Sequence, residues 1–245
     1  MDHAIYTAMG AASQTMDQQA VTASNLANAA TPGFRAQLNA LRAVPVEGWS
    51  LPTRTLVAAS TPGADMSQGT MDYTERPLDV AVQQDGWLAV RTADGSEAYT
   101  RNGNIQISST GQLTIQGNPV MGDGGPIAVP QGAEITIAAD GSITVLNGGD
   151  APNATVQLGR LKLVKATGQE VTRGDDGMFR PTAAAQAQRG AALKVMPGVL
   201  EGSNVKPVET MVDMISNARR FEMQMKVISN VDENEQKANQ LLNMS

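Results

Sequence analysis

The last 38 residues of the chain, from Val208 to Ser245, contain neither proline nor glycine and follow directly on Pro207. Proline is favoured in the first turn of a helix, and both residues are rare inside one, so this stretch predicts a single long helix. At about 1.5 Å per residue it would be roughly 57 Å long. Such a helix cannot pack on a small core along its whole length, and it therefore needs another long element beside it.

The predicted C-terminal helix, residues 207–245, is amphipathic. Apolar residues recur at steps of three and four, which places them on one helix face, and the outer positions carry charges of both signs. The apolar positions are Met211, Met214, Ala218, Phe221, Met225 and Ile228, followed after a shift by Val231, Ala238 and Leu241.

A second helix is predicted within residues 1–34, where the same spacing recurs. Thr31-Pro32-Gly33-Phe34 ends it, because proline disfavours the helical conformation in the residue before it and glycine suits the following turn. Between Ala4 and Phe34 only Asp17 is ionised, fewer charges than a solvated helix normally carries. We therefore expect other chains to cover this helix. The alternative is that the two helices form an intramolecular hairpin with no further partner. Its stripe is Ile5, Met9, Ala12, Met16, Gln19, Ala23, Leu26 and Ala30.

The middle of the chain, residues 78–195, changes from helical spacing to alternation with a period of two. Turn dipeptides such as Asp94-Gly95, Asn102-Gly103 and Asp140-Gly141 fall between the short alternating runs. This pattern predicts an antiparallel β-rich domain. The runs are Leu78/Val80/Val82, Trp87/Ala89, Ile105/Ile107, Leu113/Ile115, Ile135/Ile137, Ile143/Val145, Val156/Leu158 and Leu161/Leu163.

The predicted fold class is α+β, a central antiparallel β-rich domain flanked by long N- and C-terminal helices that pair in a coiled-coil-like inner domain. The predicted order is an N-terminal helix in residues 1–34, an extended connector in 35–77, the β-rich outer domain in 78–195, a connector in 196–206 and the C-terminal helix in 207–245.

Composition excludes several classes of function. The chain has no cysteine and one histidine, His3, which removes disulfides, thiolate nucleophiles and sites that need histidine as a base. A net charge of −6 and eight aromatic residues disfavour nucleic-acid binding. No stretch is long and apolar enough for a membrane helix, and the N-terminus lacks the positive region of a cleaved signal. We therefore expect no nucleic acid, no membrane insertion and, by default, a cytoplasmic location.

Candidate sites for chemistry have simpler explanations. Gly122-Asp123-Gly124-Gly125 lacks the spacing of a nucleotide-binding loop, and Asp175-Asp176-Gly177 lacks the ligand pattern of a calcium loop. Asp72, Glu75 and Asp79 could form the acid and base of a glycosidase, but few aromatics are present to stack on a sugar. We expect no enzyme, no cofactor and no metal. A carbohydrate-active enzyme and a secreted β-rich binding module remain alternatives, although neither explains the end helices.

Three groups of motifs resemble those of the flagellar rod and hook axial proteins. They occur in the family's order, with Ser24 in place of an asparagine and Trp87-Leu88 in place of the more common Phe-Phe. The motifs are residues 23–34 (ASNLANAATPGF), 78–88 and 99–103 (LDVAVQQDGWL and YTRNG), and 200–205 (LEGSNV) with Met214-Ile215 and Arg219-Arg220-Phe221-Glu222.

This resemblance implies a rod subunit that the flagellar type III export apparatus secretes unfolded and without cleavage. The subunit would assemble in the periplasm with copies of itself and other rod proteins, so the expected location changes from the cytoplasm to the basal-body rod. The opening residues 1–6 and the single β domain are most similar to the proximal rod members, with the distal rod protein as the alternative. Its function would be mechanical, the transmission of motor torque.

The resemblance and the apolar stripes together predict an assembly interface on the two ends of the chain. The expected interface residues are Ile5, Met9, Met16, Asn25, Leu26, Asn28, Pro32, Gly33 and Phe34 near the N-terminus, and Met211, Met214, Phe221, Met225, Ile228 and Leu241 near the C-terminus.

Overall fold

The computed structural model describes residues 2–45, 55–148, 154–174, 176–182, 188–189 and 193–242. The chain divides into two compact units. The first comprises Met1–Ala29, Gln37–Gly63 and Val205–Ser245, and the second comprises Ala30–Ala36 and Ala64–Asn204. Both ends of the chain therefore belong to one unit and the β-rich middle to the other, which confirms the predicted α+β class.

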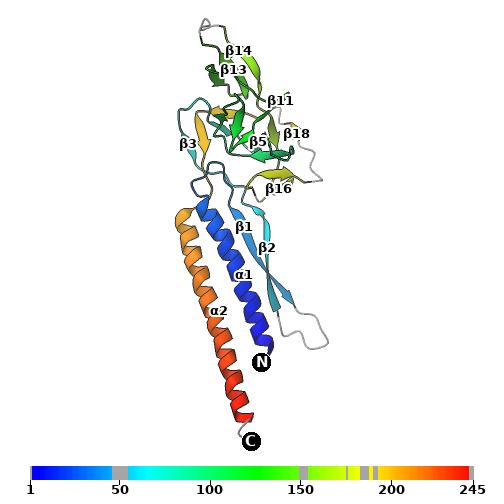
Figure 1. Cartoon of the computed structure of the whole chain (residues 1–245), viewed down its shortest axis with the longest axis vertical. Helices are drawn as coiled ribbons and strands as arrows, with labels where there is room; N and C mark the ends of the chain where they lie inside the picture. The colour runs from blue at the N-terminus through cyan, green and yellow to red at the C-terminus, as the bar shows by residue number, and fades with distance from the viewer. Residues whose placement is uncertain are drawn as a thin grey trace. The chain divides into compact units, whose positions relative to one another are not determined.

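Two long helices dominate the first unit. α1 (Asp2–Ala27) and α2 (Pro207–Leu242) lie side by side and run in opposite directions (Figure 1). α2 begins at Pro207, whose fixed φ suits the first helical position, and Glu209 in the first turn complements the positive end of the helix dipole. With 36 residues it is roughly 54 Å long.

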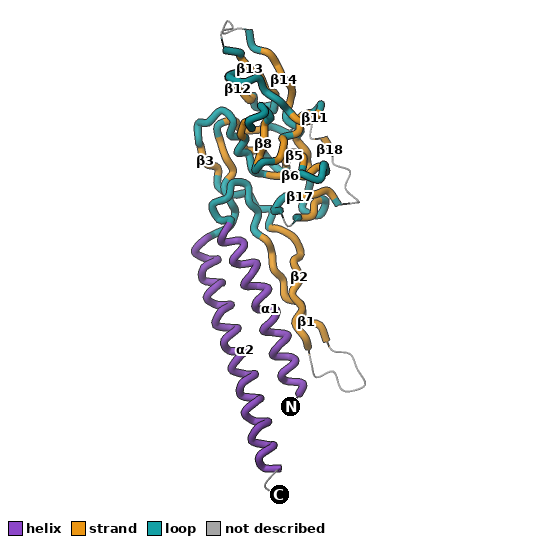
Figure 2. The backbone as a smooth tube through the Cα atoms, in the orientation of Figure 1, coloured by secondary structure: helices purple, strands orange, loops and turns teal. Residues whose placement is uncertain are grey.

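A two-stranded ribbon completes the first unit. β1 (Gln37–Pro45) pairs with β2 (Thr55–Ala64), and β1 packs against α1 (Figure 2). The sequence predicts an extended connector over residues 35–77, and the structure differs by pairing two parts of this segment with each other. Each strand of such a ribbon is an edge strand, so a proline such as Pro45 is compatible with it and its sequence pattern is weak.

The second unit is built from short strands, and the strand pairs described are antiparallel. Each predicted alternating run overlaps a strand, whereas other strands, including β3, β6, β16, β17, β19 and β20, are not predicted. β3, β19 and β20 pair with distant segments, which a local pattern does not show. The strands are β3 (Met71–Tyr73), β4 (Val80–Val82), β5 (Gly86–Arg91), β6 (Glu97–Thr100), β7 (Gln106–Ile107), β8 (Leu113–Ile115), β9 (Asn118–Pro119), β10 (Met121–Gly122), β11 (Gly125–Pro126), β12 (Glu134–Ile137), β13 (Ser142–Leu146), β14 (Val156–Arg160), β15 (Leu163–Lys165), β16 (Val171–Arg173), β17 (Phe179–Pro181), β18 (Gln188–Arg189), β19 (Val195–Pro197) and β20 (Val199–Glu201).

Within the described residues, the largest sheet of this unit has the order β16-β17-β6-β5-β15-β18. Smaller sheets surround it, with the orders β12-β13-β14, β7-β8-β9, β19-β4, β20-β3 and β10-β11. β19 and β20 lie next to each other in the sequence and pair with β4 and β3 respectively. The end of the β-rich segment is thereby tied to its beginning.

β5 separates two clusters of buried side chains. Leu88 and Val90 point into a large aliphatic cluster with Ile105 and Leu113, while Trp87 lies in a second cluster that contains the other buried aromatic rings of this unit, apart from Phe34. Both faces of β5 are therefore buried, and its sequence reads as a continuous apolar run rather than a strict alternation.

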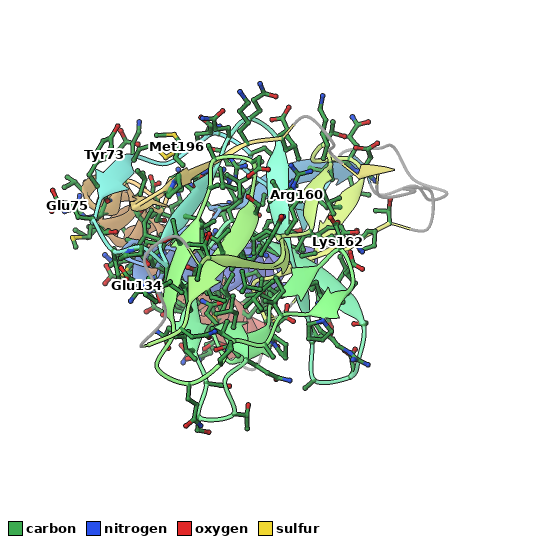
Figure 3. All side chains as sticks on the ribbon, turned by 90° about the horizontal axis from the view of Figure 1, so that it is seen from above. Tyr73, Glu75, Glu134, Arg160, Lys162 and Met196 are labelled. Atoms are coloured by element: carbon green, nitrogen blue, oxygen red, sulfur yellow. The ribbon has the colours of Figure 1, made fainter. Side chains whose placement is uncertain are left out.

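The surface of the second unit carries isolated charged pairs. Lys162 bonds Glu97 at 2.6 Å and Arg160 bonds Asp140 at 2.8 Å. Figure 3 places Arg160 and Lys162 together, and Tyr73 and Glu75 at a different edge. Exposed pairs of this kind contribute little to stability.

No helix of the described chain is both long and apolar enough to cross a membrane. Among the residues that the structure describes, no group of three or more histidine, aspartate or glutamate side chains is arranged to hold a metal ion.

Candidate functional site

Three of the sequence motifs meet in the second unit. The Gly33 N–H donates a hydrogen bond to the Glu201 carbonyl oxygen at 2.7 Å, and the Asn204 N–H donates to the Phe34 carbonyl oxygen at 3.3 Å. Gly33 also lies directly against the peptide bond between Arg101 and Asn102. The segments 31–34, 99–103 and 200–204, far apart in the sequence, therefore form one site.

A buried charge cluster lies at the centre of this site. Glu201 is fully buried, and its Oε1 lies 2.6 Å from Arg35 Nη2 while its Oε2 lies 3.0 Å from Arg101 Nε. The Gly69 N–H also donates to Oε1 at 3.1 Å. One carboxylate thus joins two guanidinium groups from different segments. Removing one member of such a group is costly, because it leaves a buried charge without compensation.

Arg101 is held by further contacts. Its Nη1 donates to the Gly86 carbonyl oxygen, and its guanidinium lies over the Trp87 ring, 5.8 Å from the centroid. Burial lowers the pKa of Arg101 below its ordinary value, and Glu201 opposes this shift. The neighbouring Arg35 lowers the pKa further, because two close positive charges destabilise each other.

Aromatic side chains surround the cluster. The Trp87 ring packs against Phe179 with centroids 4.7 Å apart, and its Nε1 donates to the Ala166 carbonyl oxygen at 2.9 Å. The Arg173 guanidinium lies 4.6 Å from the ring centroid of Phe34, and burial lowers the pKa of Arg173. Tyr99 lies in the same buried cluster as Trp87 and Phe179. Burial raises the pKa of Tyr99 to about 12, and the nearby Glu97 contributes to the shift.

Asn204 binds three backbone groups in two segments with one side chain. Its Oδ1 accepts a hydrogen bond from the Ala36 N–H at 2.7 Å, and its Nδ2 donates to the carbonyl oxygens of Asp65 at 2.9 Å and Ser67 at 3.1 Å. An amide can both donate and accept, so asparagine satisfies both kinds of backbone group here.

The sequence predictions do not include this buried cluster among the site residues. Arg101 and Glu201 occur within the motifs, but nothing in their spacing shows that they face each other. Arg35 follows the first motif directly. One signal in the sequence could have indicated a buried ion pair. Two arginines and a glutamate occur within, or directly after, motifs whose other residues are mostly small and polar.

The helix residues predicted for assembly divide into two groups. Met9, Met16, Met211 and Met225 are 53%, 60%, 50% and 46% exposed. Ile5, Leu26, Met214, Phe221 and Ile228 are half-buried. The side chain of Leu241 lies outside the described residues. The structure therefore leaves the exposed methionines without cover from this chain.

The contact between α1 and α2 overlaps the predicted stripes only in part, because Ala12 belongs to the predicted stripe of α1 whereas Thr15 and Asn217 belong to neither stripe. Ala12 and Thr15 are buried on α1, and Asn217 is buried on α2. The Thr15 hydroxyl donates to Gln224 Oε1 at 3.3 Å, and Asn217 Nδ2 donates to the Thr22 hydroxyl at 3.4 Å. The fully buried positions of this contact are thus small or polar. Half-buried Met214, Phe221 and Ile228 lie on the same face of α2, three or four residues from Asn217 or Gln224. We call this stripe the polar seam: Ala12, Thr15, Thr22, Asn217 and Gln224.

The remaining predicted residues have partners within the chain. Asn25 Oδ1 accepts from the Gln37 N–H at 2.8 Å and its Nδ2 donates to the Gln37 carbonyl oxygen at 3.0 Å. Asn28 Nδ2 donates to the Ser24 carbonyl oxygen at 2.9 Å. Phe34 is buried in the second unit, and Pro32 is half-buried. Their role in assembly stays a prediction.

Comparison with known protein families covers both ends and the middle of the chain. Residues 5–35 match the family described as flagella basal body rod protein, and residues 81–145 match the flagellar hook protein FlgE/F/G D1 domain. Residues 196–241 match the flagellar basal body rod FlgEFG protein C-terminal family. The three matched segments contain most of the motifs that form the site described above.

The chain belongs to the flagellar basal-body rod protein family, as its motifs predict. It is 75% identical to the flagellar basal-body rod protein FlgF of Salmonella typhimurium, with all of both chains covered. The FlgF of Escherichia coli K12 gives the same identity and coverage. The FlgF of Buchnera aphidicola from Schizaphis graminum is 34% identical over the full length of both chains, and the FlgG of Caulobacter vibrioides is 30% identical over 96% of this chain and 97% of its own.

Proposed function

We propose that this chain is a structural subunit of the proximal rod of the bacterial flagellum, and that it assembles through its two terminal helices. The observation that carries the proposal is the composition of the polar seam. The side chains that α1 and α2 bury fully are small or polar, while large apolar side chains on both helices remain exposed.

Exposed apolar side chains on both helices support assembly with other chains. Met9 and Met16 lie two helical turns apart on α1, and Met211, Ile215 and Met225 are exposed on α2. We infer that these side chains belong to an interaction site, since apolar patches on a surface mark such sites. Methionine suits such sites because its flexible side chain fills irregular gaps between helices. Neighbouring copies and other rod proteins would cover these residues.

In the assembled rod, the terminal helices would form a coiled-coil-like inner layer, and neighbouring subunits would complete the cores that a single chain leaves open. Helices with few buried contacts of their own gain most of their stability from such neighbours. The function is mechanical, because a continuous packed layer can transmit torque from one subunit to the next. It requires no catalytic group.

Delivery to the rod would use the flagellar type III export apparatus, with assembly in the periplasm. A chain without cysteine suits this route, because it cannot form wrong disulfides while it enters an oxidising compartment unfolded. The family match and the FlgF relatives support this location over the cytoplasm.

The test compares two replacements of Met16 in a flagellated strain. Met16→Asp places a charge on the exposed apolar surface of α1, so we expect the chain to be absent from purified basal bodies and the cells not to swim. Met16→Leu keeps the apolar surface and should swim normally. Urea unfolding of both variants in a Trp49→Phe background, as in the unfolding experiments below, is followed by Trp87 fluorescence and checks that the second unit is intact. Normal swimming and incorporation of Met16→Asp would refute the proposal and favour a β-rich binding module instead.

A further inference from the structure

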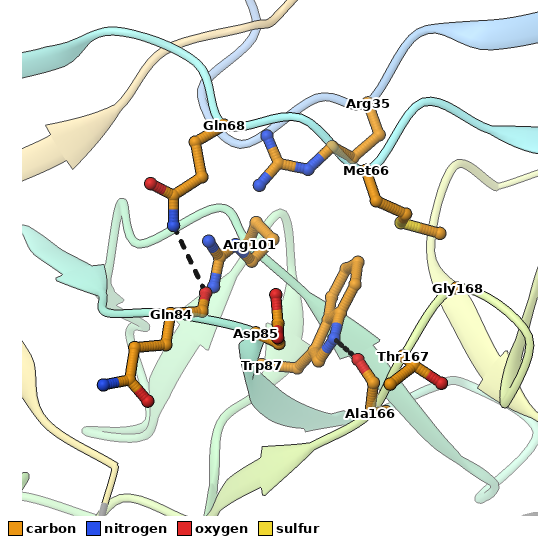
Figure 4. Close-up of a pocket in the computed structure, with 10 residues that line it drawn as sticks. All are labelled: Arg35, Met66, Gln68, Gln84, Asp85, Trp87, Arg101, Ala166, Thr167 and Gly168. Atoms are coloured by element: carbon orange, nitrogen blue, oxygen red, sulfur yellow. Dashed lines mark hydrogen bonds between the residues drawn. The ribbon is translucent and has the colours of Figure 1, made fainter.

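A pocket with a volume of about 130 Å³ lies beside the buried charge cluster of the second unit. A cavity of about 150 Å³ accommodates benzene, so this pocket can hold a group the size of a carboxylate with its methylene. Figure 4 shows the side chains around it. The lining residues are Arg35, Met66, Gln68, Gln84, Asp85, Trp87, Arg101, Ala166, Thr167 and Gly168.

Positive charge exceeds negative charge in the buried part of this site. Arg35 and Arg101 are both buried, and Glu201 is the one buried carboxylate that contacts them within the described residues. The site therefore holds two guanidinium groups and one carboxylate. Burial without full compensation disfavours the charged form, which agrees with the direction of the Arg101 pKa shift.

Arg35 has donors without acceptors. Its side chain is 2% exposed, and Nη2 bonds Glu201, but Nε and Nη1 have no hydrogen-bond partner within the described protein. The guanidinium extends into the pocket between Gln68 and Arg101 (Figure 4). A buried N–H group without an acceptor is costly, and the planar guanidinium is well suited to bind a second carboxylate.

We propose that this pocket binds the carboxylate of an acidic side chain from a neighbouring rod subunit. The proposal rests on the proposed function, because only an assembled chain has neighbouring subunits that can supply the carboxylate. An incoming carboxylate would give the two buried arginines a second buried carboxylate beside Glu201, and its methylenes would lie against Trp87 and Met66. An acidic partner is abundant in an assembly of this chain, since each copy has 24 aspartate and glutamate residues.

Two exposed residues at the pocket allow the charge to be tuned without disturbing the buried cluster. Asp85 is exposed and opposes the lowering of the Arg101 pKa, so it competes with an incoming anion. Gln84 is its exposed neighbour. Asp85→Asn should strengthen anion binding, and Gln84→Glu should weaken it, while Arg35, Arg101 and Glu201 remain unchanged in both variants.

The first experiment measures anion binding by the full chain in a Trp49→Phe background, in which Trp87 is the remaining tryptophan. Acetate is titrated at constant ionic strength, and neutral acetamide is the control. We expect a saturable change in Trp87 fluorescence with acetate and none with acetamide. The apparent affinity should rise several-fold in Asp85→Asn and fall several-fold in Gln84→Glu. Equal responses to both probes, no response, or unchanged affinities in both variants would overturn the proposal.

The second experiment identifies the source of the carboxylate. A photoreactive cross-linking residue replaces Gln84 in a flagellated strain, and cross-linked peptides are sequenced from purified basal bodies. We expect a peptide of a neighbouring rod subunit with an aspartate or glutamate beside the cross-link. Acetate binding without such a cross-link would show that the ligand is a free carboxylate, and it would refute a neighbouring subunit as the source. Absence of the chain from basal bodies would instead contradict the proposed function.

Discussion

Gly33 illustrates how strongly a single residue is constrained in the motif site. Its φ of +69° lies in the left-handed region, which residues with a side chain adopt only at a cost. A Cβ atom at this position would lie 2.3 Å from the Arg101 carbonyl carbon and the Asn102 nitrogen. Glycine is therefore required twice, for the turn after Pro32 and for the close contact between two backbone segments.

Gly33→Ala should destabilise the second unit more than Gly117→Ala does. Gly117 has a similar φ of +80°, but nothing lies within 4 Å of an added Cβ. We expect a loss of about 1 kcal/mol for Gly117→Ala from backbone strain alone. Gly33→Ala adds a collision with backbone atoms, and we expect about 3 kcal/mol. Urea unfolding followed by Trp87 fluorescence measures both. Equal losses would contradict the close contact.

Glu201→Gln should destabilise the second unit by about 3–5 kcal/mol, because two buried guanidinium groups lose their shared counter-charge. Arg160→Gln is the matched control, since it breaks the exposed contact with Asp140, and its effect should stay below about 1 kcal/mol. The free energies of unfolding come from the same urea titration. A small effect of Glu201→Gln would mean that the two arginines find other acceptors.

Among the elements, the two helices could be predicted from the sequence and their contact could not. α2 begins at Pro207 because local signals determine a helix start. The predicted stripe of α1 contains buried Ala12 but also exposed Met9 and Met16, and the chain buries Thr15 and Asn217, which the predicted stripes do not contain. Both stripes have helical spacing, and a single sequence does not show which stripe serves the chain itself. The charge cluster was equally hidden, because its members meet only through tertiary pairing of distant segments.

Asn217→Leu should stabilise the helix pair. Asn217 is buried in the polar seam, and its hydrogen bond to the Thr22 hydroxyl is long at 3.4 Å. That hydroxyl keeps its bond to the Gln18 carbonyl oxygen at 2.8 Å, so leucine leaves no donor unpaired on α1. We expect a gain of about 1 kcal/mol from the added apolar burial, seen as a higher midpoint in thermal unfolding followed by circular dichroism.

The control for this change is Gln236→Leu, which lies on an exposed part of α2 and should give no gain. A lower midpoint for Asn217→Leu would show that the amide determines how the helices align. A single buried polar residue can fix the register of paired helices in this way.

At the scale of the whole molecule, the two units differ in how complete their cores are. The second unit buries Val80, Leu88 and Val90 fully within a large aliphatic cluster. In the described part of the first unit, α1 and α2 bury Ala12, Thr15 and Asn217, which offer little apolar surface. We therefore expect the second unit to be stable in a free chain and, under the proposed function, the helices to gain stability from neighbouring subunits.

Hydrogen exchange should separate the two units. In the free chain, amides of α1 and α2 should exchange much faster than those of β5, because local opening is easiest where few apolar contacts are buried. In purified basal bodies the helix amides should become as protected as β5, since neighbouring subunits then cover Met9, Met16 and Met225. Mass spectrometry of the two samples measures this. Full protection of both helices in the free chain would show that the polar seam alone holds them, and assembly would then join helices that are already stable.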